Sequence, residues 1–168
     1  MNQPDSNEFA PFYLTYIETV SENVMDELEH QAVSFSEFLK SISEEKAFYA
    51  YADGKWTIKE LAGHVIDTER IMTYRALTIS RQDKTVLPGF EENEYVKNAH
   101  FNDRSLASLA EEFAAVRKSN LYFFKSLSDV ELQYMGTANG KTISVRALLY
   151  IIAGHLNHHK KILTERYL

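Results

Sequence analysis

Glycine and proline are scarce in this chain, and their scarcity limits the folds it can adopt. Six glycines and three prolines occur among 168 residues, and long stretches contain neither. Because these two residues disfavour helix interiors most strongly, the uninterrupted stretches favour helices. The sequence therefore predicts an all-α fold.

Four of these stretches carry apolar residues at helical spacing, with charged residues between them. The second has the capping-box pattern Thr57-Ile58-Lys59-Glu60 at its start, and serines precede the third and fourth. Four long amphipathic helices indicate a four-helix bundle. The predicted helices cover residues 12–42, 57–80, 105–127 and 144–167.

The segments between these helices are also informative. Residues 81–104 form a connection so long that we expect it to be functional or partly helical. Residues 128–142 are rich in turn formers, with Asn139-Gly140 as the predicted turn. Residues 49–51 and 133–135 are predicted to form short extended pieces at one end of the bundle.

Length and composition restrict the possible function classes. The chain has the length of one ordinary domain, which we expect to span residues 1–168. No apolar run reaches the length of a membrane span, and the N-terminus lacks the features of a signal peptide. We therefore expect a cytoplasmic protein with no membrane partner.

Charge and cysteine content narrow the chemistry. The net charge is −6 and the basic residues are scattered, which argues against nucleic-acid binding, because that function requires a basic surface. The sequence contains no cysteine. Any transition-metal site must therefore use histidine, aspartate or glutamate.

Histidines gather near the end of the chain, inside the apolar run of the last predicted helix. His155 and His159 are four residues apart, a spacing that puts two side chains on one helix face, about 5–6 Å apart at Cβ. Two imidazoles placed in this way can share one divalent metal ion.

A weak internal repeat indicates a third ligand. A Gly-Lys pair precedes both Thr57 and Ser144, the predicted caps of the second and fourth helices. His64 comes seven residues after its cap, and His155 eleven residues after its own. If both helices start from the same end of the bundle, His64 comes level with the His155 and His159 pair. Bundles build metal sites from facing helices in this way.

These features together resemble the DinB-like family, whose YfiT-type members are described as candidate metal-dependent hydrolases. The resemblance is carried by residues 56–64 (WTIKELAGH) and residues 145–159 (VRALLYIIAGHLNHH). It covers nearly the whole chain. It implies an up-down-down-up bundle, often dimeric, with a nickel or zinc ion on three histidines. Carried over one at a time, these ligands are His64, His155 and His159.

The leading hypothesis is a metal-dependent enzyme. Three histidines leave one coordination position open for water or substrate, and the better-understood members of the resembling family include transferases of low-molecular-weight thiols. We therefore expect hydrolysis of a small molecule, or transfer of a thiol to it. The sequence does not identify the substrate, the metal or a general base.

The alternative hypothesis is a non-catalytic bundle of the same fold, which would bind metal or a partner in a stress-related role. Aromatic residues on the first and third predicted helices exceed the needs of one bundle face and favour a homodimer. A carboxylate-bridged di-iron site is disfavoured, because it needs Glu-x-x-His pairs on two helices. The aromatic residues in question are Phe35, Phe38, Phe113, Tyr122, Phe123 and Phe124.

Several residues near the predicted site have two interpretations. Asp67 and Glu69 could accept the second N–H of His64, as carboxylates do beside metal-bound histidines, or they could belong to a solvated helix face. Asp67 is the better candidate of the two. Trp56 precedes a helix cap, where a hydrophobic staple is its expected role.

The remaining histidines and two aromatic residues are expected outside the metal site. His158 points away from the pair and is predicted to be exposed or to support the ligands. His30 and His100 lie in acidic or polar surroundings, so we expect both at the surface. Phe90 and Tyr95 could line the mouth of a pocket, and Phe90 could equally close the end of the bundle.

Overall fold

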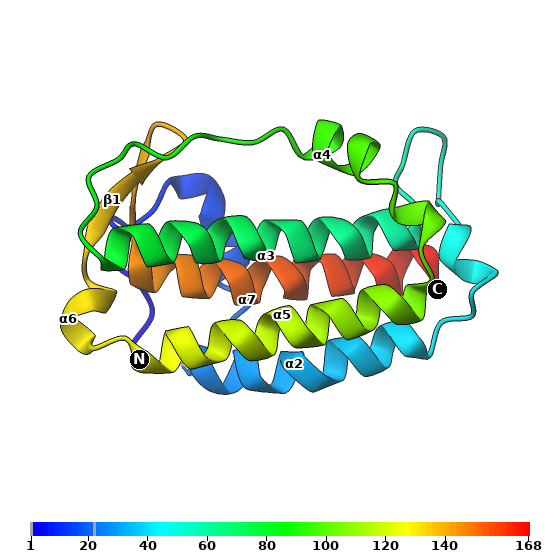
Figure 1. The fold of residues 1–168 in the computed structure, drawn as a ribbon, viewed down its shortest axis with the longest axis horizontal. Coiled ribbons are helices and arrows are strands. Elements are labelled where there is room, and N and C mark those ends of the chain that lie inside the picture. Colours follow the sequence, from blue (N-terminus) through cyan, green and yellow to red (C-terminus); the bar gives the residue numbers. More distant parts are fainter. Residues whose placement is uncertain (1, 22) are drawn as a thin grey trace.

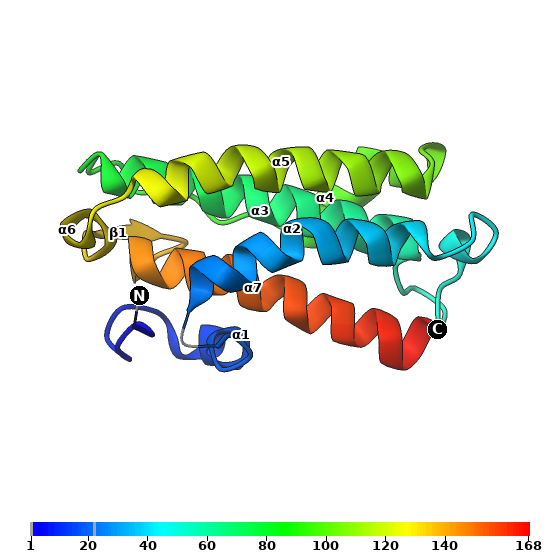
Figure 2. The same ribbon diagram turned by 90° about the horizontal axis from the view of Figure 1, so that it is seen from below.

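Four long helices pack side by side in the computed structural model, which describes residues 2–21 and 23–168. Figures 1 and 2 show that α2 and α7 run in one direction and that α3 and α5 run in the other. This up-down-down-up order confirms the predicted bundle. The four helices are α2 (Val24–Lys40), α3 (Ile58–Ser80), α5 (Leu106–Ser126) and α7 (Val145–Ile162).

The long connection between α3 and α5 follows from this topology. Since α3 and α5 are parallel, the chain has to return along the whole bundle before α5 can begin (Figure 1). The returning segment contains α4 (Glu92–Ala99) and the 3-10 turn η3 (Phe101–Asp103). The expectation that residues 81–104 are partly helical is therefore confirmed.

Side-chain caps fix the starts of three long helices. Thr57 Oγ1 accepts a hydrogen bond from the Glu60 backbone N–H at 3.1 Å, and the Thr57 N–H donates to the Glu60 carboxylate at 2.7 Å. This pair is the predicted capping box. Ser105 and Ser144 cap α5 and α7 in the simpler way, through one hydrogen bond each.

The first predicted helix, residues 12–42, is wrong as a single element. The chain forms a 3-10 turn, η1 (Pro11–Tyr13), and one short helix, α1 (Leu14–Ile17), before α2 begins at Val24. After α1 the backbone N–H groups of Thr19 and Val20 donate to the carbonyls three residues before them, at 3.0 and 3.1 Å, and the helical hydrogen bonds stop there. As a result α1 packs against α7 and does not continue into α2 (Figure 2).

A small hairpin lies where α5 leads into α7. It follows α6 (Asp129–Leu132) and pairs β1 (Met135–Ala138) with β2 (Lys141–Ser144) in antiparallel register. Asn139 and Gly140 both adopt positive φ angles, +51° and +69°, as a tight hairpin turn requires. The predicted turn is confirmed.

The two short segments predicted as extended do not share one end of the bundle. Residues 133–135 reach the start of β1, but residues 49–51 form no strand. They follow the 3-10 turn η2 (Lys46–Phe48) at the opposite end, beside the last turn of the chain, η4 (Leu163–Tyr167) (Figure 1). Within the described ranges 2–21 and 23–168, no helix combines the length and apolar character of a membrane span.

Candidate metal centre

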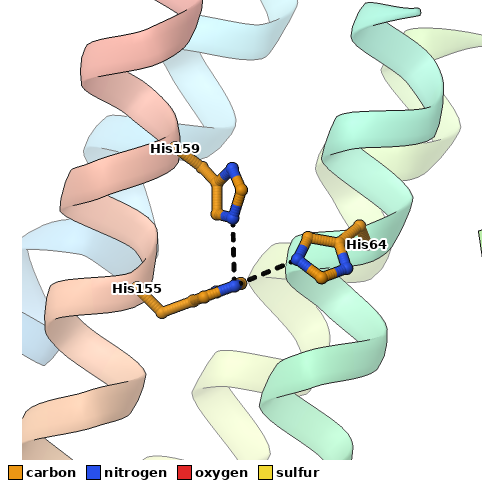
Figure 3. A group of neighbouring side chains, drawn as sticks. All are labelled: His64, His155 and His159. Carbon is orange, nitrogen blue, oxygen red and sulfur yellow. Dashed lines mark hydrogen bonds between the residues drawn. The ribbon is translucent and has the colours of Figure 1, made fainter. Parts of the chain in front are cut away.

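His64, His155 and His159 converge between α3 and α7 (Figure 3). The reason differs from the predicted one, because the two helices start from opposite ends of the bundle (Figure 1). His64 lies about 9 Å along α3 from its start, and His155 and His159 lie about 10 and 5 Å from the end of α7, at 1.5 Å per residue. Antiparallel packing therefore brings the three rings level.

The ring nitrogens of this histidine cluster face one another. The Nε2 atom of His155 lies 3.0 Å from that of His64 and 3.0 Å from that of His159. All three side chains are buried, with exposed fractions of 3%, 7% and 9% for His64, His155 and His159. In Figure 3, His64 reaches across from α3 to the two rings on α7.

Burial keeps the cluster uncharged. Desolvation lowers the pKa of His64 from 6.5 to about 4. Desolvation, together with repulsion from His64 and His158 once these are protonated in acid, lowers the pKa of His159 to about 3. Burial also holds the pKa of His155 well below its ordinary value. The three imidazoles are therefore neutral at pH 7, the form that binds metal.

The cluster fits a divalent metal ion. A tetrahedral zinc site with Zn–N bonds of about 2.0–2.1 Å places its ligand nitrogens about 3.3 Å apart, close to the 3.0 Å separations here. One feature departs from usual metal sites: the buried Nδ1 of His159 has no hydrogen-bond partner, whereas ligand histidines normally donate through the second nitrogen.

Two aromatic side chains cover the cluster. The Trp56 ring lies 4.7 Å from the His64 ring, between centroids, so Trp56 does more than the staple role predicted for it. The Tyr16 ring contacts His155 edge-on, at 5.5 Å. Sequence reasoning missed Tyr16, because its placement depends on the break between α1 and α2.

Gly154 allows Tyr16 to approach this closely. A Cβ atom at Gly154 would lie 2.1 Å from the Tyr16 backbone carbonyl oxygen, so only glycine leaves room for α1 at this point of α7. The docked α1 segment places Tyr16 against His155 and also against His158, whose ring centroid lies 5.3 Å away.

A pocket of about 240 Å³ reaches the cluster at His159. Its walls come from the segment before α3, from the start of α4 and from the end of the chain. This placement gives a small molecule access to His159. The lining residues are Tyr51, Gly54, Lys55, Trp56, Leu61, Glu92, Asn93, His159, Ile162 and Tyr167.

The carboxylates predicted to support His64 have other partners. Asp67 pairs with Arg70 at 3.6 Å. Glu69 is buried and accepts two hydrogen bonds from Arg117, at 2.7 and 2.9 Å. The interpretation in which either carboxylate orients His64 is therefore wrong, and Glu69 is not on a solvated face either.

The other residues named from the sequence lie mostly as expected. His30 and His100 are exposed, and His158 is half-buried against Tyr16. Phe90 and Tyr95 contact each other, with ring centroids 5.3 Å apart, but neither lines the pocket. The long connection contributes Glu92 and Asn93 there instead.

The sequence of the chain matches a known protein superfamily. The profile of the DinB superfamily matches residues 27–163. A protein of Bacillus mycoides named as a candidate metal-dependent hydrolase is 25% identical over 158 residues, which is 90% of each chain. A similarly named protein of Bacillus anthracis is 26% identical over the same length, again 90% of each chain.

Solved structures share the fold. YfiT from Bacillus subtilis, described as a candidate metal-dependent hydrolase with an unusual four-helix bundle topology, superposes with a TM-score of 0.68. The match has 15% identity and covers 98% of this chain and 91% of YfiT. A mycothiol-dependent maleylpyruvate isomerase gives a TM-score of 0.67 at 14% identity, over 86% of this chain and 61% of the isomerase. The chain, whose sequence matches the superfamily profile from α2 to the end of α7, belongs to the DinB superfamily.

Proposed function

We propose that this protein is a metal-dependent enzyme that hydrolyses a small molecule or transfers a low-molecular-weight thiol to it. In this proposal His64, His155 and His159 hold one divalent cation, nickel or zinc. The observation that carries it is the convergence of three buried, neutral imidazoles at the end of a pocket.

The protein's own residues provide the setting for such a reaction. Three histidine ligands leave a coordination position for water or substrate. A divalent cation there supplies Lewis acidity, which lowers the pKa of a water or thiol ligand and polarises an electrophile. Trp56 and Tyr16 pack against the rings of His64 and His155 and so limit the access of bulk water, which strengthens electrostatic interactions at the cluster.

Names of relatives support both reaction types. Proteins similar over 90% of their length are named as candidate metal-dependent hydrolases. The isomerase with the same fold depends on a low-molecular-weight thiol. We therefore propose both reactions for the same site, and the choice between them requires an assay of metal-loaded protein with a panel of such thiols and a generic electrophile.

Elemental analysis of untagged protein tests the metal site. We expect about one divalent metal ion per chain, as for other three-histidine sites, and its identity follows from the same measurement. His155→Ala should reduce this content to near zero. The matched control is His30→Ala, which removes an exposed histidine and should leave the metal content unchanged.

The non-catalytic alternative makes the opposite prediction. Wild-type protein that stays metal-free after incubation with zinc or nickel salts, and melts at the same temperature as the His155→Ala variant, would exclude the enzymatic proposal. Such a result would leave a bundle that acts through a partner.

A further inference from the structure

One wall of the pocket is aromatic and apolar. The rings of Tyr51 and Tyr167 contact edge-on, with centroids 5.0 Å apart. The Tyr167 hydroxyl donates to the Trp56 carbonyl at 2.8 Å, which fixes the wall to the start of α3. Leu61 and Ile162 also line the pocket. Such a surface suits the planar or apolar body of a ligand, because these side chains offer few polar groups to it.

Two cations lie against Tyr51, one of the residues that line the pocket. Lys55 Nζ is 5.9 Å from the centroid of the Tyr51 ring, and Arg166 Cζ is 5.5 Å from it. The Arg166 guanidinium also donates to the Tyr51 hydroxyl at 3.4 Å. The two side chains come from different segments, before α3 and at the end of the chain, yet they meet at the same ring.

Neither cation is neutralised by an acidic side chain. Among the described residues, no carboxylate lies within 4.0 Å of the charged nitrogens of Lys55 or Arg166. The pocket lining contains a single carboxylate, Glu92, from α4. The lining residues therefore carry one positive and one negative charge, Lys55 and Glu92. Arg166 adds a second positive charge at the Tyr51 ring, although the whole chain has a net charge of −6.

We infer that the pocket takes a compact anionic ligand with an aromatic or apolar body. The anionic group would face Lys55 and Arg166, the body would lie on the wall of Tyr51 and Tyr167, and the reacting group would reach the histidine cluster. The statement that the reacting group reaches the histidine cluster rests on the function proposed above. The placements of the anionic group and of the ligand body depend only on the side chains around Tyr51 and Tyr167.

A matched series of probe thiols tests the inference through binding, without any assay of turnover. The probes are 4-mercaptobenzoate, 4-methylbenzenethiol and 4-(aminomethyl)benzenethiol, which share one body and carry a negative, neutral or positive tail. Isothermal titration of zinc-loaded protein should show the anionic thiol binding about threefold to tenfold more tightly than the neutral one, the range expected for two exposed charges. The cationic thiol should bind more weakly than both.

Charge reversal identifies the residues responsible. Lys55→Glu and Arg166→Glu should each reduce the preference for the anionic thiol, and the double variant should reverse it. All these changes are at exposed positions, so the fold should be kept. Lys84→Glu is the matched control: it makes the same change at an exposed position four residues after the end of α3 and should leave the preference unchanged.

The outcomes separate this inference from the proposed function. Binding of all three thiols with equal affinity, or an order of affinities that the double variant does not alter, overturns the charge assignment and leaves the metal site standing. Preference of the wild-type protein for the cationic thiol overturns it too, since Glu92 would then dominate. Failure of all three thiols to bind zinc-loaded protein overturns this inference, whereas the metal site is judged separately by the metal content of the wild-type and His155→Ala proteins.

Discussion

Three imidazoles share a buried site in which no carboxylate lies close enough to join them as a metal ligand among the described residues. A protonated imidazole there would lose its hydration and gain no counter-ion, so the neutral form is favoured. Neutral imidazole is also the form that binds metal. Metal affinity should therefore stay nearly constant from pH 7 to about pH 5. A site built from exposed histidines, which protonate near pH 6.5, would already lose affinity in this range.

The same burial makes the metal-free fold sensitive to acid. The pKa of His64 is about 4 in the folded protein and about 6.5 in an unfolded chain. Between these values the unfolded chain binds more protons, so stability falls as the pH falls. From pH 7.5 to pH 5 we expect His64 alone to remove about 2 kcal/mol from the free energy of unfolding.

Urea denaturation of metal-free protein at pH 7.5 and pH 5 measures this loss. The His64→Phe variant should lose less stability on acidification than the wild type, because the titrating group is gone. His30→Phe, at an exposed position, should retain the full wild-type loss. Equal losses in all three proteins would show that another group unfolds the protein in acid.

Gly154 offers a second test at the residue scale. In Gly154→Ala the new methyl group would meet the Tyr16 backbone, whereas in Gly63→Ala it would meet the Phe101 ring, 2.4 Å away. A side chain can shift more cheaply than backbone. We expect Gly154→Ala to cost about 1–3 kcal/mol, the usual range for overpacking, and Gly63→Ala to cost less. Thermal denaturation ranks the two variants, and the reverse order would contradict the docking of α1 on Gly154.

The sequence predicted the ligand set better than the surroundings of the ligands. The i,i+4 spacing of His155 and His159 depends only on one helix, so it can be read locally. Helices that start from the same end would place His64 beside them, but α3 and α7 start from opposite ends (Figure 1), so only the family resemblance identifies His64 for the right reason. Tyr16 and Trp56 contact the cluster through tertiary packing, which local patterns do not encode.

At the scale of elements, a network built around one buried ion pair links all four long helices. Arg117 on α5 is fully buried, bonds to Glu69 on α3 and donates to the Gln31 side chain on α2 at 2.8 Å. Gln31 in turn donates to the Ala153 carbonyl on α7 at 2.9 Å. The network pairs two buried charges, either of which would be very costly without its partner. It also holds α7 at Ala153, two residues before His155.

Breaking this pair should be costly. Arg117→Met leaves the Glu69 carboxylate buried without its cation, and we expect a loss of about 3–5 kcal/mol. The double variant Arg117→Met/Glu69→Leu should recover much of that loss, because it removes both charges. Chemical denaturation of the two single variants and the double variant gives the coupling between the charges.

An exposed ion pair provides the comparison. Lys125 on α5 pairs with Glu29 on α2 at 2.8 Å, but about half of each side chain is exposed. Lys125→Met should change stability by at most about 1 kcal/mol. A similar loss for Lys125→Met and Arg117→Met would mean that burial does not set the cost of the internal pair.

Capped helices were predictable and the uncapped one was not. The starts of α3, α5 and α7 carry Thr or Ser caps that their sequences display. The segment of residues 12–42 keeps its apolar spacing through the break, since Ile17 and Val20 are both buried. Periodicity alone therefore could not locate the end of α1.

At the scale of the whole molecule, the dimer stays a prediction, with weaker support than the sequence suggested. Three of the aromatic side chains on α2 and α5 are buried inside the bundle, and Tyr122 is the one that is largely exposed. The size of the protein in solution, measured by light scattering, would decide. A dimer should bury Tyr122, so Tyr122→Glu should then shift the protein to a monomer.

The returning connection is the whole-molecule feature that shapes the site, because α4 supplies Glu92 and Asn93 to the pocket. The helix has eight residues, no side-chain cap at its start and a single buried residue, Val96. A helix this short is marginal without tertiary contacts. We therefore expect α4 to open locally while the bundle stays folded.

Hydrogen exchange measures this opening directly. Backbone amides of α4 should exchange at least about tenfold faster than those at the centres of α3 and α5. Val96→Ala should speed exchange in α4 further and leave α5 unchanged, since it removes the one buried contact of that helix. Amides of α4 protected as strongly as those of α5 would contradict this, and would mean that the pocket wall is as rigid as the bundle core.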